Sequence, residues 1–478
     1  MTRPNVLLVV ADDHAANAVG CYGGPHAVTP RIDTLAADGM RFTACGCTNS
    51  LCAPSRATIL TGTYNHVNGV TTLSTEFDAR QPTFPGLLRD SGYRTALIGK
   101  WHLGHGGFHD PRGFDHWEVL PDQGDYHDPE FLRMDGESHL RAGYATDLIT
   151  DMSLDWLRSV EDGEDPWCLL VQHKAPHRPW EPAPRHADLT FDSAAAATET
   201  FFDDYTDRAS AAADARMRVG RDLNREDLKA DPPSDAERDV DPVAYARWAL
   251  DRYLTDYLRC VVALDEGVGR LLDHLDATGQ AEDTVVIYTS DQGFFLGEHG
   301  WYDKRFMYAE SLQMPLVVRY PRLVASGSES DALVLNVDFA QTILDLAGVP
   351  DIDRPCIRSM VPLLGGSSAD DIGWRELAYY RYWEHLDGCH GVAAHRGVRT
   401  RDRKLVHYYG SGCGQPGASA EETAEEWELF DLDRDPRELH SVHDHPAYAA
   451  DLARLRAELD AVATDLGDTV PTTIKETT

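Results

Sequence analysis

The sequence predicts an α/β protein with a large, mostly parallel sheet between two layers of helices, followed by a smaller C-terminal α+β domain. Two observations predict the large sheet: short apolar runs end abruptly in polar loops, and helical patterns lie between these runs. Such runs are typical of strands buried on both faces, and their alternation with helices favours parallel order. A third observation predicts the smaller domain: after residue 370 the sequence pattern changes to that of short strands joined by turns.

Four apolar runs are the expected central strands. In chain order they are "NVLLVV" before "ADDH", "RTALI" before "GKWHLGHG", "WCLLVQ" before "HKAPHRPW", and "DTVVIYT" before "SDQGFFLGEHG". The helical patterns between them include "ATDLITDMSLDWLRSV" and "YLRCVVALDEGVGRLLDHLDATG". Ligands of such sheets bind beyond the carboxyl ends of the strands. Because each polar loop follows such an end, we expect the loops to face one cavity.

The rest of the chain divides into an irregular segment and the small domain. Residues 181–242 are rich in Ala, Asp, Arg and Pro with weak apolar periodicity, which fits either a cover over the site or a solvated insertion. We expect a catalytic domain over 1–370 and a C-terminal subdomain over 371–478. The subdomain is predicted to have antiparallel strands joined by turns in "LAYYRYWEH", "HRGVRTRDRKLVHYYG" and "EWELFDLDRDP", and a terminal helix in "AYAADLARLRAELDAVATDLG".

Composition excludes several classes of partner. The 478 residues carry a formal charge of −35, which disfavours binding to nucleic acid and to anionic membranes. Nine cysteines, an odd number, do not make a disulfide framework. The N-terminus does not resemble a signal peptide, and no apolar run approaches the length of a membrane span. We therefore expect a cytoplasmic protein.

Two acidic clusters follow expected strands. Asp12 and Asp13 are adjacent, and Asp291 and Gln292 stand in "SDQG". Taken alone, the aspartate pair fits a helix N-cap as well. Taken together, three carboxylates and an amide oxygen make a hard, all-oxygen site that suits Ca²⁺ or Mg²⁺. His14 and His299 lie near these clusters in the sequence and keep a softer metal open.

Four cationic or titratable side chains also lie on the candidate site loops. Lys100 and His102 alternate with a tryptophan, so their side chains point the same way on an extended segment. His177 and Lys304 are weaker candidates, since each also fits an ordinary loop residue. Together the four could hold a tetrahedral oxyanion against a metal ion and supply an acid and a base for ester cleavage.

Cys52 stands where folding does not require a cysteine. If "PSRATILTG" begins a helix with Pro54 in its first turn, Cys52 lies at the positive end, where oxyanions bind and thiolates are stabilised. Arg56 lies one turn further and could reach back to the same group. A plain cysteine nucleophile fits poorly here, because a thiolate is a weak ligand for a hard metal and is easily oxidised.

"CAPSR" resembles the C-x-P-S-R signature of type I sulfatases, in which the cysteine is oxidised to Cα-formylglycine. The resemblance continues through seven segments in the family's order, which cover most of the chain. They are "NVLLVVADD", "GCYGG", "TPRIDTLAADGMRF", "GYRTALIGKWHLG", "APHRPW", "TVVIYTSDQGFFLGEHGWYDKRFMYAESLQMPLVVRYP" and "WELFDLDRDPRELHSV".

The resemblance implies an alkaline-phosphatase-like sandwich with a small C-terminal domain that has a four-stranded antiparallel sheet, and it implies the activity of a sulfate ester hydrolase. It implies one Ca²⁺ per chain next to Cys52. It also implies that a formylglycine-generating enzyme, which reads the unfolded chain, converts Cys52 to formylglycine, and that Arg56 stabilises the hydrate of this aldehyde. The implied calcium ligands are Asp12, Asp13, Asp291, Gln292 and residue 52 itself, Cys52 in its converted form. The implied residues for sulfate binding and proton transfer are Lys100, His102, His177 and Lys304.

Within the family the small domain resembles that of carbohydrate sulfatases, with the nearest similarity to enzymes for 6-sulfated N-acetylglucosamine. We expect exo-action on a small sulfated sugar. Substrate-binding candidates, which fit surface residues equally well, are Trp383, His385, His390 and His395; His173 is a supporting candidate without a firm counterpart. Two other functions stay open, a formylglycine-dependent phosphonate monoester hydrolase or phosphodiesterase and a non-catalytic sulfate-binding protein. An oligomer is also possible.

Overall fold

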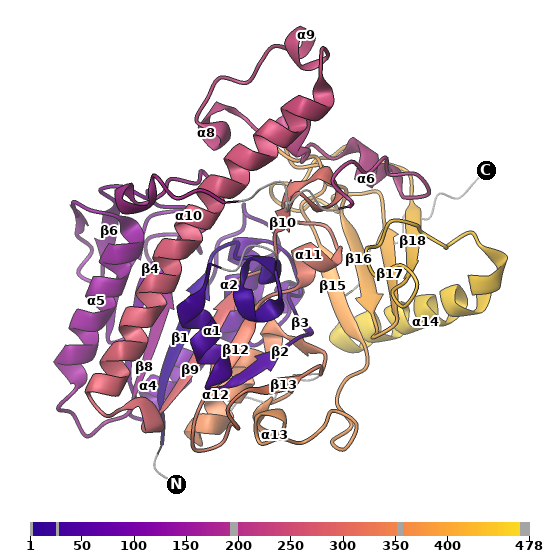
Figure 1. Cartoon of the computed structure of the whole chain (residues 1–478). Coiled ribbons are helices and arrows are strands. Elements are labelled where there is room, and N and C mark those ends of the chain that lie inside the picture. Colours follow the sequence, from indigo (N-terminus) through magenta and orange to yellow (C-terminus); the bar gives the residue numbers. More distant parts are fainter. Residues whose placement is uncertain (1–2, 25–27, 192–198, 351–356, 469–478) are drawn as a thin grey trace.

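A ten-stranded mixed sheet forms the centre of the molecule (Figure 1). The computed structural model describes residues 3–24, 28–191, 199–350 and 357–468. The strands, in their order across the sheet, are β13 (Ser328–Ser330), β2 (Met40–Phe42), β12 (Leu316–Arg319), β9 (Thr284–Ser290), β1 (Asn5–Ala11), β8 (Trp167–Gln172), β4 (Arg94–Lys100), β5 (His116–Leu120), β6 (Glu130–Arg133) and β7 (Ser138–Leu140).

The five central strands run parallel. β1 pairs with β9 on one side and β8 on the other, and β4 joins β8 to β5. The outer strands β12, β6 and β7 pair antiparallel to their inner neighbours. All of β1 except Asn5 is buried, as expected for a strand covered on both faces. The predicted α/β class with a mostly parallel sheet is confirmed.

Helices cover both faces of the sheet, and β1 contributes to the core on each side. Val6, Leu8 and Val10 belong to one apolar cluster, whereas Leu7 and Val9 belong to the other. This alternation is the period-2 pattern of a strand. On one face lie α1 (Pro30–Ala37), α5 (Ala145–Val160) and α10 (Pro242–Ala277); on the other lie α2 (Cys52–Thr61), α4 (Phe84–Asp90) and α12 (Phe339–Ala347).

The irregular segment 181–242 contains four short helices where it is described. They are α6 (Ser210–Asp214), α7 (Val219–Asp222), α8 (Arg225–Leu228) and α9 (Asp235–Arg238). Figure 1 shows α8, α9 and the first turns of α10 projecting from the body of the molecule. α10 begins 15 residues before the apolar pattern "YLRCVV", because Asp241 caps it by accepting from the Ala244 backbone and Pro242 occupies its first turn.

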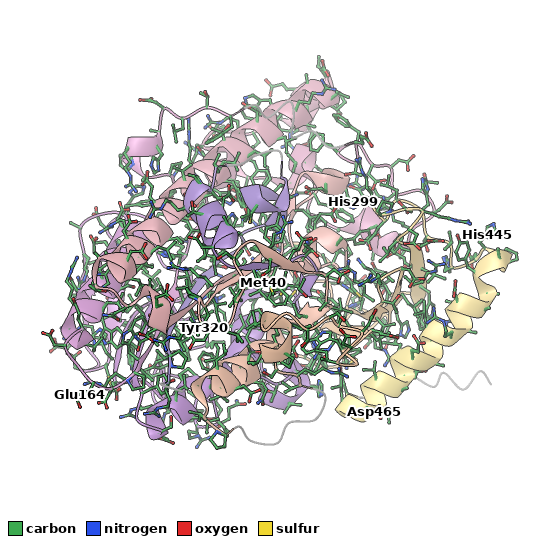
Figure 2. The ribbon with its side chains drawn as sticks, turned by 60° about the horizontal axis from the view of Figure 1, so that its bottom comes forward. Met40, Glu164, His299, Tyr320, His445 and Asp465 are labelled. Carbon is green, nitrogen blue, oxygen red and sulfur yellow. The ribbon has the colours of Figure 1, made fainter. Side chains whose placement is uncertain are left out.

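The C-terminal part forms the predicted four-stranded antiparallel sheet. Its strands are β15 (Ala378–Tyr382), β16 (His395–Arg399), β17 (Arg403–Tyr408) and β18 (Glu426–Asp431), in sequence order. One face packs on α14 (Ala449–Leu466), which Figure 2 shows running along the outside of the sheet from near His445 to Asp465. The other face joins the core of the large sheet through Tyr380, Val406 and Phe430. The proposed boundary between residues 370 and 371 stays a prediction.

Smaller elements complete the described fold. Two-stranded sheets pair β10 (Phe295–Leu296) with β11 (Tyr302–Asp303) and β3 (Cys45–Gly46) with β14 (Val334–Leu335); the short helices are α3 (Asn65–Asn68), α11 (Ala309–Leu312) and α13 (Val361–Leu364). Among the helices in the described ranges, none has the length and apolarity needed to span a bilayer.

Candidate active site

Cys52 opens α2, as the sequence predicts. Leu51 occupies the N-cap, and Cys52 is buried with 1% of its surface exposed. Its Sγ lies 3.3 Å from Nζ of Lys304, and Sγ, an Asp12 carboxylate oxygen and a His177 ring nitrogen all lie within 4.8 Å of one another. The positive end of α2 therefore meets two of the predicted polar loops.

The thiol of Cys52 is not the stabilised thiolate that its helix position suggests. Burial raises the pKa of Cys52 above its ordinary value, and the Asp12 carboxylate raises it further, although Lys304 opposes both. The helix end is outweighed because the charged form loses its water and faces a neighbouring negative charge. Unmodified Cys52 is thus a protonated, weak nucleophile near neutral pH.

Three carboxylates meet at the carboxyl ends of β1 and β9. Oxygens of Asp12, Asp13 and Asp291 lie within 4.8 Å of one another, and all three residues are fully buried. The backbone fixes them: the Asp13 N–H donates to Oδ1 of Asp291 over 3.1 Å, and the Asp12 N–H donates to the Ala175 carbonyl over 3.1 Å. Gln292 joins the group by donating from Nε2 to Asp13.

This group fits a hard cation. Oδ1 of Asp12, Oδ2 of Asp13 and Oε1 of Gln292 are buried oxygens without a hydrogen-bond partner among the described residues. Burial raises the pKa of Asp13 to about 7 and that of Asp291 to about 6, so the ionised cluster needs more positive charge than its neighbours supply. An all-oxygen set of this kind suits Ca²⁺ or Mg²⁺.

The contacts of His14 and His299 do not support the alternative that these histidines ligate a softer metal ion. Nδ1 of His14 lies 2.5 Å from the Tyr288 hydroxyl, and Nδ1 of His299 lies 3.0 Å from Asp203. In the part of the chain that the structure describes, neither histidine belongs to a group of possible metal ligands.

Arg56 ties α2 to the acidic group rather than reaching solvent. It is 1% exposed, and its Nε donates to Oδ2 of Asp291 over 3.0 Å. Its NH1 donates to the Lys100 carbonyl over 3.0 Å, and NH2 lies 3.7 Å from Oδ2 of Asp12. The guanidinium therefore orients two carboxylates of the cluster while its chain position places it one turn behind Cys52.

Lys100 and His102 converge at the end of β4. Nζ of Lys100 donates to Oδ2 of Asp12 and to Oε1 of Gln123, whose Nε2 lies 3.1 Å from Nε2 of His102. Burial and the Lys100 charge hold the pKa of His102 well below its ordinary value. Gln123 links the two residues, and no motif in the sequence pointed to it.

His177 and Lys304 close the other side of the cluster. Nδ1 of His177 lies 2.6 Å from the Arg178 carbonyl, which leaves Nε2 facing Oδ2 of Asp13 at 3.7 Å. Burial, followed by the Lys100 charge, lowers the pKa of His177. Burial also works against the charge of Lys304, but the Asp13 carboxylate, to which Nζ donates, holds the pKa of Lys304 above its ordinary value.

A cavity of about 380 Å³ opens above Cys52, His177 and Lys304. Its wall contains charged residues that sequence reasoning did not select: Arg178, Asp303, Arg305, Glu384 and Asp387. The only sequence signal for Asp303 and Arg305 is their position on either side of Lys304, a predicted site residue. Two larger hollows, of 680 and 600 Å³, contain none of the predicted site residues.

Of the predicted substrate contacts, only His390 lines this cavity, 3.4 Å from Asp303. Both ring nitrogens of His385 bond to backbone, one near the Glu421 carbonyl and one accepting from the Ala394 N–H. His395 is used in the same way, because its Nε2 accepts from the Met307 N–H. Neither ring lines the cavity, and contact of His385 and His395 with substrate stays a prediction.

Trp383 and His173 also lie away from the cavity lining. Trp383 packs under Arg381, whose guanidinium carbon lies 3.4 Å from the ring centroid. His173 is fully buried between Thr150 and Gly267, on α5 and α10, and burial lowers its pKa to about 3. Both rings fill space inside the protein, which a sequence cannot distinguish from exposure in a loop, and a role of either in substrate binding stays a prediction.

Comparison with known proteins places this geometry in context. The family described as sulfatase matches residues 4–349, and the family described as N-sulphoglucosamine sulphohydrolase, C-terminal, matches residues 297–465. An N-acetylglucosamine-6-O-sulfatase of Bacteroides thetaiotaomicron is 40% identical over 98% of this chain and 88% of its own length.

Solved structures show the same similarity. A protein in complex with its substrate D-glucosamine-2-N,6-O-disulfate superposes with a TM-score of 0.85 at 39% identity, covering 98% of this chain and 99% of the other. A phosphonate monoester hydrolase of Agrobacterium radiobacter shares the fold, with a TM-score of 0.70 at 22% identity over 97% of this chain and 96% of its own.

Proposed function

Because this chain belongs to the sulfatase family and is a sulfuric ester hydrolase, we propose that it removes the 6-sulfate from N-acetylglucosamine or a related glucosamine at the end of a small saccharide. The substrate is supported by the relative named as an N-acetylglucosamine-6-O-sulfatase and by the similar structure bound to a 6-O-sulfated glucosamine. Both cover nearly the whole of this chain, the small domain included.

The observation that carries the proposal is the position of residue 52. It lies at the positive end of a helix, 3.3 Å from Lys304 and within reach of the buried acidic group. As a protonated thiol it is a weak nucleophile there. We infer that Cys52 is converted to Cα-formylglycine by a formylglycine-generating enzyme. The hydrated aldehyde supplies an oxygen nucleophile for sulfur and a group that can release sulfate again.

Asp12, Asp13, Asp291 and Gln292 would hold one Ca²⁺ beside residue 52. Their unpartnered oxygens and raised pKa values fit such an ion. The ion supplies Lewis-acid stabilisation of negative charge on the sulfate and on the nucleophile.

The remaining residues supply charge and protons. Lys100 and Lys304 approach the cluster from opposite sides and hold the sulfate oxygens in place. Nε2 of His177 is the ring nitrogen left free, and an anion bound beside it favours its protonated form, so it can donate a proton to the departing sugar oxygen. We propose that His102, which is linked to Lys100 through Gln123, takes a proton from residue 52.

The proposal also includes a cytoplasmic location and the absence of a nucleic-acid or membrane partner; the net charge of −35 supports the latter. A cytoplasmic enzyme meets only imported, already small saccharides, which is why we propose exo-action.

Sulfate release from N-acetylglucosamine 6-sulfate and from 4-nitrophenyl sulfate, set against alcohol release from a phosphonate monoester, tests the proposal. We expect the sugar sulfate to have the highest kcat/KM and Cys52→Ala to abolish its turnover. A large preference for the phosphonate monoester would assign the alternative hydrolase. Equal activity of Cys52→Ala would refute the catalytic role of residue 52, and binding of sulfate without any turnover would leave a sulfate-binding protein.

A further inference from the structure

Glu384 is a cavity residue with a free acceptor. It follows β15 at the end that faces the large sheet and lines the cavity that contains Cys52 and Lys304. Only 5% of its surface is exposed. Its Oε2 is buried and has no hydrogen-bond partner among the described residues. The carboxyl group does accept one hydrogen bond, from the Leu73 backbone.

The other charged groups of the cavity wall are already paired. Arg305 binds Asp303 and lies 3.6 Å from Asp387. Asp387 also accepts from the backbone and lies 3.1 Å from the ring of His390. Glu384 is thus the carboxyl group in this lining whose oxygen is left for a ligand.

Arg178, the second arginine of the wall, is held elsewhere as well. It donates twice to Asp227, over 3.1 and 2.6 Å, and lies 3.8 Å from Asp303. The charge of Arg305 acts on Glu384, but both guanidinium groups donate to other carboxylates, and among the described residues neither donates to Oε2 of Glu384. A buried acceptor without a partner is costly unless a bound molecule supplies a donor.

We propose that Glu384 is a specificity-determining residue that accepts a hydrogen bond from a ring hydroxyl of the leaving sugar. The inference rests on the proposed function, because it requires a sugar in the cavity. A sugar ring carries several hydroxyl donors, and a site with a buried acceptor discriminates strongly against molecules that lack the matching donor. An aryl sulfate carries no such hydroxyl.

The titration of Glu384 sets the conditions of the test. Burial raises the pKa of Glu384 to about 7, with Arg305 opposing and Asp387 adding to the rise, and His390 opposing. Assays at pH 8 therefore keep the carboxylate ionised, so that it acts only as an acceptor.

The first experiment compares Glu384→Gln and Glu384→Ala with the wild type on N-acetylglucosamine 6-sulfate and 4-nitrophenyl sulfate. We expect kcat/KM for the sugar to fall at least about tenfold further than kcat/KM for the aryl sulfate, because a hydrogen bond to a charged group is lost only with the sugar. Glu421→Gln, an exposed glutamate of the same domain, is the matched control and should change neither value.

A second experiment identifies the donor. The 3-deoxy and 4-deoxy analogues of the sugar sulfate are assayed with wild type and Glu384→Ala. For the analogue that lacks the partner hydroxyl, Glu384→Ala should cause no further loss, whereas for the other analogue it should cause the full loss.

Three results separate the possible failures. If Glu384→Gln and Glu384→Ala lose sugar and aryl turnover equally, or lose neither, the assignment of Glu384 is overturned. If neither analogue shows coupling, the ring-hydroxyl contact is overturned. If the wild type cleaves the aryl sulfate but no sugar sulfate, the proposed substrate fails, and the role of Glu384 fails with it.

Discussion

At the scale of single residues, the site depends on carboxyl groups that burial makes hard to ionise. Asp13 and Asp291 have pKa values raised to about 7 and about 6, yet each lies within a few ångströms of other carboxylates. A divalent cation between them would restore ionisation and satisfy their free oxygens. We therefore expect the folded protein to bind calcium more tightly than the unfolded chain does.

Asp291→Asn should remove most of the stabilisation by calcium. At a calcium concentration a hundredfold above its Kd, the wild type should gain about 3 kcal/mol of unfolding free energy. The variant should gain much less, as measured by thermal unfolding with calcium and with a chelator. Asp155→Asn, exposed on α5, should respond like the wild type. An equal calcium response in Asp291→Asn would contradict the assigned ligand set.

Glu428 provides a test of pH dependence away from the site. Burial raises its pKa to about 7; its Oε2 accepts from the Tyr408 hydroxyl over 3.0 Å, and its Oε1 accepts from the Ala209 N–H over 3.0 Å. The folded state binds the proton of the Glu428 carboxyl group more tightly than the unfolded state does. The contribution of Glu428 to the free energy of unfolding is therefore present at low pH and is lost as the pH rises through 7. We expect the free energy of unfolding of the wild type to fall by about 2 kcal/mol more between pH 5 and pH 8 than that of Glu428→Gln. Unfolding in urea at the two pH values measures this difference.

Glu422→Gln, at an exposed glutamate of the same subdomain, is the control for this comparison and should keep the wild-type pH dependence. If Glu428→Gln keeps it as well, the buried carboxyl group does not carry a raised pKa.

Sequence reasoning found the residues that follow strands and missed those that meet only in space. Asp12 and Cys52 stand out because each breaks a local pattern. Glu384 does not, although it lies between two residues that the sequence analysis selected, Trp383 and His385. The chain turns tightly at Glu384, where the His385 N–H donates to the Trp383 carbonyl over 2.9 Å, and no local pattern in the sequence indicates which way that turn directs the side chain.

At the scale of elements, strands and well-patterned helices were predicted closely and weakly patterned ones were not. β8 and α5 match their predicted runs, since each buries a continuous or strongly periodic set of side chains. The first turns of α10 bury few residues, so only Asp241 and Pro242 signalled its start. The segment 181–242 gave no pattern because its short helices are held by contacts with distant parts of the chain.

One such contact links this segment to the wall of the cavity. Asp227 on α8 holds Arg178 by two hydrogen bonds and is 2% exposed. Asp227→Asn should lower kcat/KM for the sugar sulfate about tenfold, because Arg178 loses a charged, bidentate partner and its position in the cavity wall. Steady-state kinetics on the sugar sulfate measure this loss.

Asn224→Ala separates this effect from the stability of α8, because Asn224 caps the helix without contacting Arg178. The cap variant should keep most of the activity. If it loses as much as Asp227→Asn, the segment acts through its own folding and not through Arg178.

At the scale of the whole molecule, the alkaline-phosphatase-like fold implied by the resemblance is confirmed, and the charge of the chain gives a further expectation. The net charge of −35 repels an anionic substrate as it approaches the protein. Raising the salt concentration from 20 to 150 mM shortens the range of that repulsion and should raise kcat/KM for a sugar sulfate roughly twofold. A fall in kcat/KM over this range would show that attraction by the cavity dominates the encounter.

The central claim is that residue 52 reacts as an aldehyde beside the buried acidic cluster. The most direct measurement is the mass of the peptide that contains residue 52, taken on preparations made with and without a co-expressed formylglycine-generating enzyme and set against their activity. We predict that a loss of about 18 Da appears at residue 52 and that kcat per chain rises in proportion to the fraction converted. Full sulfatase activity in a preparation whose residue 52 is entirely unmodified cysteine would contradict the claim.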